Sequence, residues 1–243
     1  MFHSFGQCEK VAASRLREIA TLPTLKPVPS IIAAVTFKGG SGKSSVIAAL
    51  AAHWLLAGHN PAVIDADPQG TVMGWCQPGG ALAGLRVVAD TSDHIGATIA
   101  ALAKDHSPVL VDTPGFRARA VIDALAAADL AVIPCRASPA DVPVAVETYR
   151  LIQEINATPE RKRRPIMARF LLTMTTPGSV IARHVRAQIE EARLPLLKAE
   201  LASRVAWPEA GLSGDTPSSL DPDSPAAQEI EALARELAKL AKS

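Results

Sequence analysis

A glycine-rich turn carrying two lysines is the stretch of this sequence best suited to chemistry. It reads FKGGSGKSS over residues 37–45 and lies between an apolar run and a stretch with helical character. Its three glycines allow positive φ angles, so consecutive backbone N–H groups can face a polyphosphate at the start of the helix. In such a loop Lys43 contacts the β- and γ-phosphates, and the Ser44 hydroxyl binds Mg²⁺. The sequence therefore predicts a phosphate-binding loop.

The turn departs from the usual pattern G-x-x-x-x-G-K-[ST] at its first position. Five residues before Gly42 the chain has Phe37 instead of glycine, and Lys38 directly precedes Gly39. A plain glycine-rich turn with two solvated lysines is the alternative interpretation. The strand expected before the turn and the helix expected after it favour the phosphate-binding loop.

Carboxylates follow two further apolar runs. The sequence DADPQG at 65–70 comes after the second expected strand, and the run VLVD at 109–112 ends in Asp112. Open α/β sheets bind ligands at the carboxyl ends of their strands, so Asp65, Asp67 and Asp112 are expected beside the phosphate loop. A turn capped by aspartate, or an ordinary aspartate at a strand end, is the alternative interpretation.

These motifs resemble those of the ParA/MinD family of P-loop ATPases. The sequence KGGSGKS resembles the deviant Walker A motif of that family, with Lys38 at the position of its signature lysine. The motifs at 65–70 and 109–115 follow in family order, and Ser138-Pro139-Ala140-Asp141 is similar to its P-S-P-x-D segment. That segment lies near the dimer interface in relatives, although a simple cap on the next helix is an equal alternative. The resemblance spans about residues 31–212.

The resemblance implies a set of site residues and cofactors. Catalysis would fall to Lys38, Lys43 and Asp67, with Asp67 orienting the attacking water. Mg²⁺ would be held by Ser44, Asp65 and Asp112. Relatives often place an asparagine after the sixth strand, where this chain has Thr173, so base contacts are assigned to Thr173 and the loop 204–208. The residues expected to bind ATP are Lys38, Gly39, Gly40, Ser41, Gly42, Lys43, Ser44, Ser45, Thr173 and Pro208.

Positive charge is concentrated in one segment, although the formal net charge is only +1. Residues 161–204 contain ten lysines and arginines against three acidic residues. Partition ATPases of the family bind DNA without sequence preference, and basic side chains supply that binding by neutralising phosphates. A solvated loop and helix face is the equal alternative. The candidate DNA contacts are Arg163, Arg164, Arg183, Arg186 and Arg204.

The pattern of the chain predicts an α/β fold, with a doubly wound, mostly parallel sheet flanked by helices. The family resemblance implies that this sheet is of the SIMIBI type of P-loop NTPase. Hydrophobic residues make up 48% of the chain and aromatic residues 4%, so the core is built from small and branched aliphatic side chains, as in a buried parallel sheet. Strands are expected at 31–36, 62–65, 86–89, 109–112, 131–134, 166–173 and 196–200, and helices at 43–57, 95–104, 117–127, 142–155 and 180–192.

The two ends of the chain carry separate expectations. Residues 1–29 are interpreted as an N-terminal arm, with a short helix at 9–20 and a proline-rich linker, and residues 30–243 as the ATPase domain. Residues 211–225 are expected to form a loop. The stretch 226–242 predicts a helix packed on the domain, and a membrane-binding helix of MinD type is the alternative.

The resulting hypothesis is a ParA-type partition ATPase, most like the short plasmid-partition (ParF-type) members. It would form an ATP-dependent homodimer, bind non-specific DNA and work with a small centromere-binding, ParB-like adaptor. Three cysteines without CxxC spacing, and no leader or long apolar run, favour a cytoplasmic protein without stable membrane association. The resemblance implies that it is nucleoid-associated. A MinD-like or cargo-positioning ATPase, acting on a membrane or a protein complex, is the alternative. A ligase or an iron–sulphur reductase on the same fold is disfavoured by the lack of their signatures.

Overall fold

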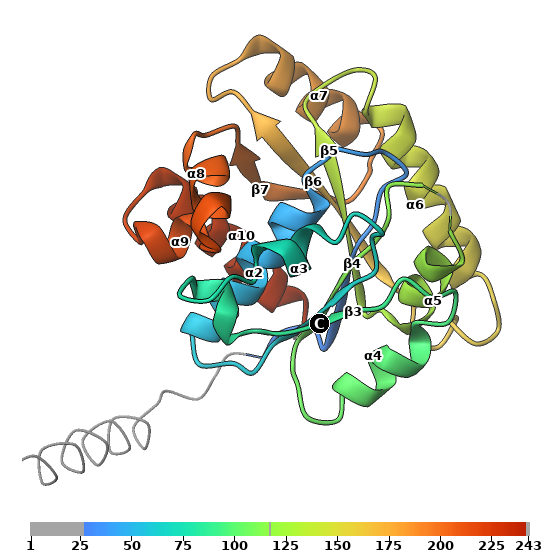
Figure 1. Ribbon diagram of the computed structural model, residues 1–243. Helices are drawn as coiled ribbons and strands as arrows, with labels where there is room; N and C mark the ends of the chain where they lie inside the picture. The colour runs from blue at the N-terminus through green and yellow to red at the C-terminus, as the bar shows by residue number, and fades with distance from the viewer. Residues whose placement is uncertain (1–26, 117, 242–243) are drawn as a thin grey trace, which may run out of the picture.

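The computed structural model describes residues 27–116 and 118–241 of this chain (Figure 1). The predicted arm at 1–29 and its helix at 9–20 lie outside these residues, apart from positions 27–29. Within the described residues, no helix has both the length and the apolar character needed to cross a membrane. The division into an arm and a domain therefore stays a prediction.

A single sheet of seven parallel strands forms the centre of the fold, in the order β3-β2-β4-β1-β5-β6-β7. All seven strands fall where the sequence predicts them, and the doubly wound α/β class is confirmed. Both faces of the sheet are covered by helices, which explains why the central strands β1, β2, β4 and β5 read as nearly continuous apolar runs. The strands are β1 (Ile31–Ala34), β2 (Ala62–Asp65), β3 (Arg86–Ala89), β4 (Val109–Asp112), β5 (Leu130–Arg136), β6 (Met167–Thr175) and β7 (Leu196–Ala202).

Helices cover the sheet in two layers, seen on either side of the strands in Figure 1. Four helices supply one apolar face, and α2, α3 and α10 pack on the other with the 3₁₀ turn η1. The first layer contains α4 (Gly96–Leu102), α5 (Arg119–Ala127), α6 (Val142–Asn156) and α7 (Val180–Glu191). The second contains α2 (Lys43–Leu56), α3 (Thr71–Trp75), η1 (Ala81–Gly84), α8 (Ala206–Ser213), α9 (Pro217–Leu220) and α10 (Pro225–Leu240).

Helix α2, which begins at the phosphate loop, is buried on nearly all sides. It packs between the sheet and the helices α3, α9 and α10, and nine of its 14 residues are buried. Small alanines allow this close packing, and the Trp54 side chain fills the space near its C-terminal end. The helix that supports the loop is therefore held rigidly.

The loop expected at 211–225 is wrong in part, because it contains the end of α8 and all of α9. Helix α8 ends at Gly214, which has a φ of 72°. Helix α9 begins with Pro217 and is closed by a reciprocal pair of hydrogen bonds between Thr216 and Ser219. Such short helices have too few residues for an apolar period, and their Pro, Gly and Ser content is typical of loops.

Helix α10 packs on the domain, as the sequence predicts. The side chains of Ile230, Leu233 and Leu237 are buried against α2 and the sheet. Two of its carboxylates also bind the edge strand β7: Glu236 accepts from the backbone N–H groups of residues 198 and 199, and Glu229 from that of residue 202. The apolar side of α10 is therefore not available to a membrane.

Candidate functional site

The glycine-rich loop joins the end of β1 to the start of α2. Gly40 and Gly42 have φ angles of 70° and 91°, values that side chains with a Cβ rarely adopt. Gly42 is the N-cap of α2, and no side chain accepts from the first N–H groups of this helix. A helix start without a side-chain cap is suited to an anion, because its N–H groups remain as donors.

Gly115 brings the loop after β4 against the glycine-rich loop. A Cβ at this position would lie 3.0 Å from the backbone nitrogen of Gly39. Only glycine allows this approach without moving the backbone. The motif at 109–115 and the glycine-rich loop thus form one continuous wall.

Two predicted metal ligands occupy adjacent strands in register. Asp65 and Asp112 are paired residues at the ends of β2 and β4, and both side chains are fully buried. Burial raises the pKa of Asp112 to about 7, although the Ser44 hydroxyl and the Lys43 charge act to lower it. Neither oxygen of Asp112 accepts a hydrogen bond of good geometry, and one oxygen of Asp65 is also without a partner.

Lys43 is buried beside these carboxylates, with 6% of its surface exposed. Burial lowers the pKa of Lys43, while the charges of Asp112 and Asp67 act to raise it. Its Nζ donates to the backbone carbonyl of Lys38 at 3.3 Å. A buried ammonium with one weak acceptor is poised for a strong anionic partner such as a phosphate.

Asp67 lies in the turn between β2 and α3. Its carboxylate accepts from the backbone N–H of Gln69 at 2.9 Å, so the second oxygen remains for other partners. Asp65 accepts from the backbone N–H of Met73 in α3 at 2.9 Å. The two aspartates thus anchor the turn that carries Asp67 and the short helix after it.

Lys38 does not point into the cradle formed by Lys43 and Asp112. Its Nζ lies 2.9 Å from the carboxylate of Asp141, which also accepts from Arg136. Burial alone would raise the pKa of Asp141, but the hydrogen bonds from Lys38 and Arg136 outweigh it and hold the pKa below its usual value. The alternative interpretation, a side-chain cap by Asp141, is therefore wrong: this residue is the N-cap of α6, but its side chain makes no cap hydrogen bond and binds two cations instead. The Ser138 hydroxyl accepts from the N–H of Ala140, and its backbone carbonyl accepts from the N–H of Asp141.

A cavity of about 140 Å³ opens beside the loop, at the carboxyl ends of β6 and β7. Thr173 lines it and donates its hydroxyl to the carbonyl of Ser41 at 2.8 Å, which links β6 to the loop. Trp207 supplies an aromatic wall, whereas Pro208 lines a neighbouring cavity. Trp207 was not among the predicted base contacts, and an aromatic residue soon after the last strand is the sequence signal that could have identified it. The lining residues are Gly42, Ser45, Val46, Thr173, Met174, Leu201, Ala202, Ser203 and Trp207.

The residues of this cradle fit a nucleotide with Mg²⁺. Oxygen ligands on a hard cation suit Asp112, Asp65 and Ser44, and the unpartnered oxygens of both aspartates are available to it. Over the described residues, no group of three or more His, Cys, Asp or Glu could hold a metal alone. Magnesium bound with phosphates needs only one or two protein carboxylates, so the small donor set agrees with this ion.

The five candidate DNA residues do not form one surface. Arg163 and Arg164 lie in the turn before β6, and Arg183 lies in the first turns of α7 after β6 has crossed the sheet. Arg163 and Arg164 therefore lie at the amino ends of the strands, whereas Arg183 lies at their carboxyl ends. Three of the five are ion-paired within the chain: Arg164 with Asp129, Arg186 with Glu200, and Arg204 with Glu229.

The parallel sheet, the uncapped helix start and the buried lysine define a P-loop nucleotide-binding protein. The chain belongs to the CobQ/CobB/MinD/ParA nucleotide-binding domain family, whose sequence profile matches residues 32–217. The predicted family membership is thereby confirmed.

Among curated relatives, the maintenance of carboxysome distribution protein A of Gloeobacter kilaueensis is 31% identical over 76% of this chain and 82% of its own length. Protein ParA of Rhizobium radiobacter is 27% identical over 73% of this chain and 80% of its own. Two solved structures share the fold at lower identity. The ATP complex of a McdA variant from Cyanothece has a TM-score of 0.69 at 17% identity, covering 87% of this chain and 97% of that one. The cell division ATPase MinD of Pyrococcus furiosus has a TM-score of 0.68 at 20% identity, covering 86% and 98%.

Proposed function

We propose that this chain is an ATP-dependent dimerising switch that positions DNA or another cargo. One observation carries the proposal: the two lysines of the loop have separate places. Lys43 is buried beside Asp112, whereas Lys38 lies outside the cradle with 30% of its side chain exposed. A lysine that does not serve its own cradle is suited to the phosphates of a second subunit.

In this proposal the cradle binds and orients ATP. The N–H groups around Gly40 and Gly42, together with Lys43, receive the phosphates, and Ser44, Asp65 and Asp112 hold Mg²⁺. The ion neutralises charge on the β- and γ-oxygens. Asp67, next to the cradle, orients a water with its free carboxylate oxygen. Thr173 and Trp207 enclose the base, because an aromatic wall gives a base a stacking surface.

Lys38 then makes hydrolysis depend on the dimer. Charge on the transferred phosphoryl group must be stabilised in the transition state, and an added lysine strengthens that stabilisation. Lys38 must leave Asp141 to do so. Breaking this ion pair is a cost that only a phosphate acceptor in the dimer offsets.

The cargo that we favour is plasmid or chromosomal DNA, which the protein would segregate together with a small centromere-binding adaptor. The relative named ParA, at 27% identity, supports it. Arg183 is the best placed of the DNA candidates, since it is exposed and lies at the carboxyl ends of the strands, as the cradle does. Arg163 is also exposed but lies at the amino ends.

A second candidate is positioning of a protein cargo. The relative named for carboxysome distribution, at 31% identity, favours it. The nucleotide chemistry is the same in both candidates, so they differ only in the adaptor and in what it carries. The membrane-positioning alternative is weaker, because the apolar side of α10 is buried on the domain.

The test is DNA binding by the purified protein with ATP and Mg²⁺, with ADP, and without nucleotide, across a series of salt concentrations. ATP-dependent binding that ignores sequence and weakens with salt, with a slope of about −0.9 per neutralised phosphate, supports the proposal. Binding in no state, with normal ATP affinity, contradicts the DNA function. A nucleotide-dependent dimer in sedimentation would then leave the switch itself intact.

A further inference from the structure

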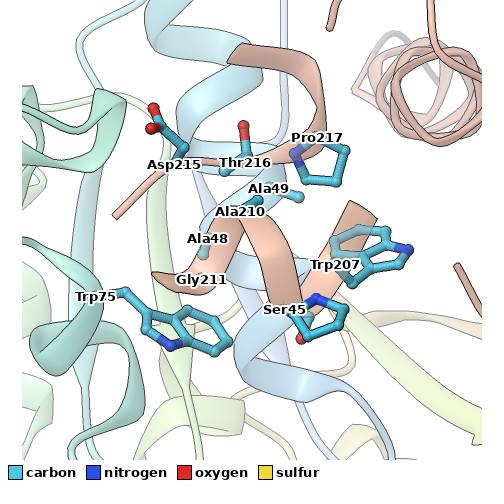
Figure 2. A pocket seen from close by; sticks show the side chains of 11 residues that line it. Ser45, Ala48, Ala49, Trp75, Trp207, Ala210, Gly211, Asp215, Thr216 and Pro217 are labelled. Atoms are coloured by element: carbon cyan, nitrogen blue, oxygen red, sulfur yellow. The ribbon is translucent and has the colours of Figure 1, made fainter. Parts of the chain in front are cut away.

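A second cavity, of about 250 Å³, lies on the other side of α2 from the sheet. Figure 2 shows its lining, with the indole rings of Trp75 and Trp207 on either side of the helix segment that carries Ala210 and Gly211. Residues 48 and 49 of α2 form an apolar wall, and Asp215 and Thr216 lie toward the other end. The pocket is therefore apolar and aromatic along its walls, with one carboxylate in its lining.

This pocket is distinct from the cradle but connected to it. It shares only Ser45 and Trp207 with the base cavity. Trp75 closes it on the other side and is the last residue of α3, the helix that follows the Asp67 turn. A ligand between the two tryptophans would thus contact both α3 and the wall of the base cavity.

The segments around the pocket are joined by two hydrogen bonds and by one close approach of their backbones. The N–H of Leu82 donates to the carbonyl of Gly214 at 3.1 Å, and that of Ala81 to Asp215 at 2.9 Å. A Cβ on Gly80 would lie 2.3 Å from the Gly214 oxygen, so no side chain fits there. These contacts hold in place the end of the pocket next to Asp215. A ligand can therefore enter only at the opposite, open end.

The elements that line the pocket expose large apolar side chains. Leu212 on α8 is 82% exposed, Leu220 on α9 is 51% exposed, and Met73 on α3 is 39% exposed. Apolar side chains gathered on elements that share one pocket mark a surface that contacts another molecule. A small ligand enclosed by the pocket alone would leave these side chains in water.

The same elements carry negative charge without positive charge. Residues 206–224, which include α8 and α9, contain four acidic residues and no lysine or arginine, and residues 66–85 contain Asp67 and no lysine or arginine. Within the described structure Glu229 is paired with Arg204 and Glu231 with Arg235, whereas Glu209, Asp221 and Asp223 are exposed and form no ion pair among those described. A partner with complementary charge must be basic.

We propose that this pocket receives one bulky apolar side chain from a basic peptide segment of a partner protein. The apolar walls take the side chain, the exposed leucines cover its flanks, and the acidic residues attract the lysines or arginines around it. We take this partner protein to be the adaptor, so the inference rests on the proposed function. Docking between Trp75 and Trp207 would give that partner direct contact with α3, the helix that follows the Asp67 turn.

The probe is a synthetic peptide of nine residues, lysine-rich, with one central phenylalanine and no tryptophan. The chain has three tryptophans, and Trp54 is buried in the core, so a change in tryptophan fluorescence reports Trp75 and Trp207. We expect saturable binding. Replacing the phenylalanine by serine should weaken it at least about tenfold, since burial of an aromatic ring is lost. A peptide with glutamate in place of lysine should weaken it similarly.

Variants of the protein locate the site. Gly211→Leu should fill the pocket, because even a Cβ at Gly211 lies 3.4 Å from Trp75 Nε1. It should abolish the response to the peptide and leave ATP affinity unchanged. Gly211→Ala, the milder change, should weaken the peptide about threefold if the leucine variant does not fold. Glu209→Gln should weaken it about twofold at low salt, and the exposed Glu154→Gln on α6 serves as the matched control.

Several outcomes would overturn the proposal. Equal binding by Gly211→Leu would place the peptide elsewhere, and equal binding of the serine peptide would reduce the interaction to charge. Equally tight binding of N-acetyl-phenylalaninamide alone would make the pocket a small-molecule site. Loss of a dimer in the leucine variant, seen by sedimentation without peptide, would make a second copy of this chain the occupant. Fluorescence with the peptide needs neither DNA nor hydrolysis, so its failure is separable from failure of the proposed function.

Discussion

Lys38 and Asp141 form an ion pair with 2.9 Å between Nζ and the carboxylate, and the aspartate is only 3% exposed. The pair joins the phosphate loop to the start of α6. Arg136 at the end of β5 shares the same carboxylate at 3.3 Å. One buried carboxylate thus holds two cations from two different elements, and its loss should be felt in stability as well as in function.

Asp141→Asn should lower the free energy of unfolding by about 1–2 kcal/mol, because both cations lose a charged acceptor that is partly screened by solvent. The folded-state pKa of Asp141 is lowered, so the stabilisation is present above its unfolded value and is lost as pH falls through the folded pKa. Urea unfolding at neutral pH and at increasingly acidic pH measures both effects. A difference from wild type that did not shrink in acid would contradict this account.

Lys38→Ala and Lys43→Ala should have different defects. Lys43→Ala should lose ATP binding, because it removes the buried cation of the cradle. Lys38→Ala should keep ATP affinity within about threefold but lose the part of hydrolysis that depends on dimers, by about a hundredfold or more. The rate per subunit, measured against protein concentration, separates the two. A Lys38→Ala protein whose rate still climbed with concentration would remove Lys38 from the proposed mechanism.

Asp67→Ala should accumulate an ATP-bound dimer, because the water is no longer oriented. Asp67→Asn is the matched control for the turn, since its side-chain oxygen can still accept from Gln69 while its charge is lost. Both should hydrolyse ATP slowly, and the asparagine variant should keep the stability of wild type. Light scattering on a sizing column after addition of ATP measures the dimer. Dissociation as fast as wild type in both variants would rule out the role.

Arg183→Ala and Arg163→Ala should affect DNA binding differently if the cradle edge faces DNA. Arg183→Ala should reduce the slope of log K against log salt by about one, and Arg163→Ala should leave it unchanged. Arg204→Ala should instead lower thermal stability, because its guanidinium holds Glu229. If Arg163→Ala had the larger effect instead, the DNA would bind at the amino ends of the strands, where Arg163 and Arg164 lie.

Gly115→Ala should weaken nucleotide binding without touching a nucleotide contact. The new Cβ would lie 3.0 Å from the Gly39 nitrogen and displace the glycine-rich loop by a few tenths of an ångström. We expect at least about a tenfold loss of ATP affinity, measured by calorimetry. Gly96→Ala on α4 is the matched control, because a Cβ there would lie 3.9 Å from the nearest side-chain atom and the backbone needs no positive φ. Unchanged affinity in Gly115→Ala would show that the loop adapts.

The sequence predicted the central strands β1, β2, β4 and β5 well because each is a short apolar run buried on both faces. Asp65 and Asp112 were correctly expected at strand ends, and the parallel register then places them side by side. The short helices α8 and α9 could not be predicted, since a segment of four or eight residues has no reliable period. Their place depends on packing against α2 and α3, which no local pattern contains.

Long-range partners were the other part that the sequence did not reveal. A cap on α6 was the local alternative for Asp141, but its carboxylate binds Lys38 and Arg136 instead. The same holds for Arg186 and Arg204, which read as free cations in the sequence. Their acceptors Glu200 and Glu229 lie 14 and 25 residues further on, on other elements. A charge count along the chain therefore overstates the positive surface.

The carboxylates of α10 have a consequence for how this chain can assemble. Strand β7 is an edge of the sheet, and an open edge can pair with a strand of another molecule. Glu236 and Glu229 occupy three of its outward N–H groups, so they act as a lock against such pairing. A chain truncated before Pro225 would lose these carboxylate acceptors, and the edge of β7 would be open to pairing with a strand of another molecule. During synthesis, the same edge is open until α10 has left the ribosome, and the nascent chain is most prone to aggregate in that interval.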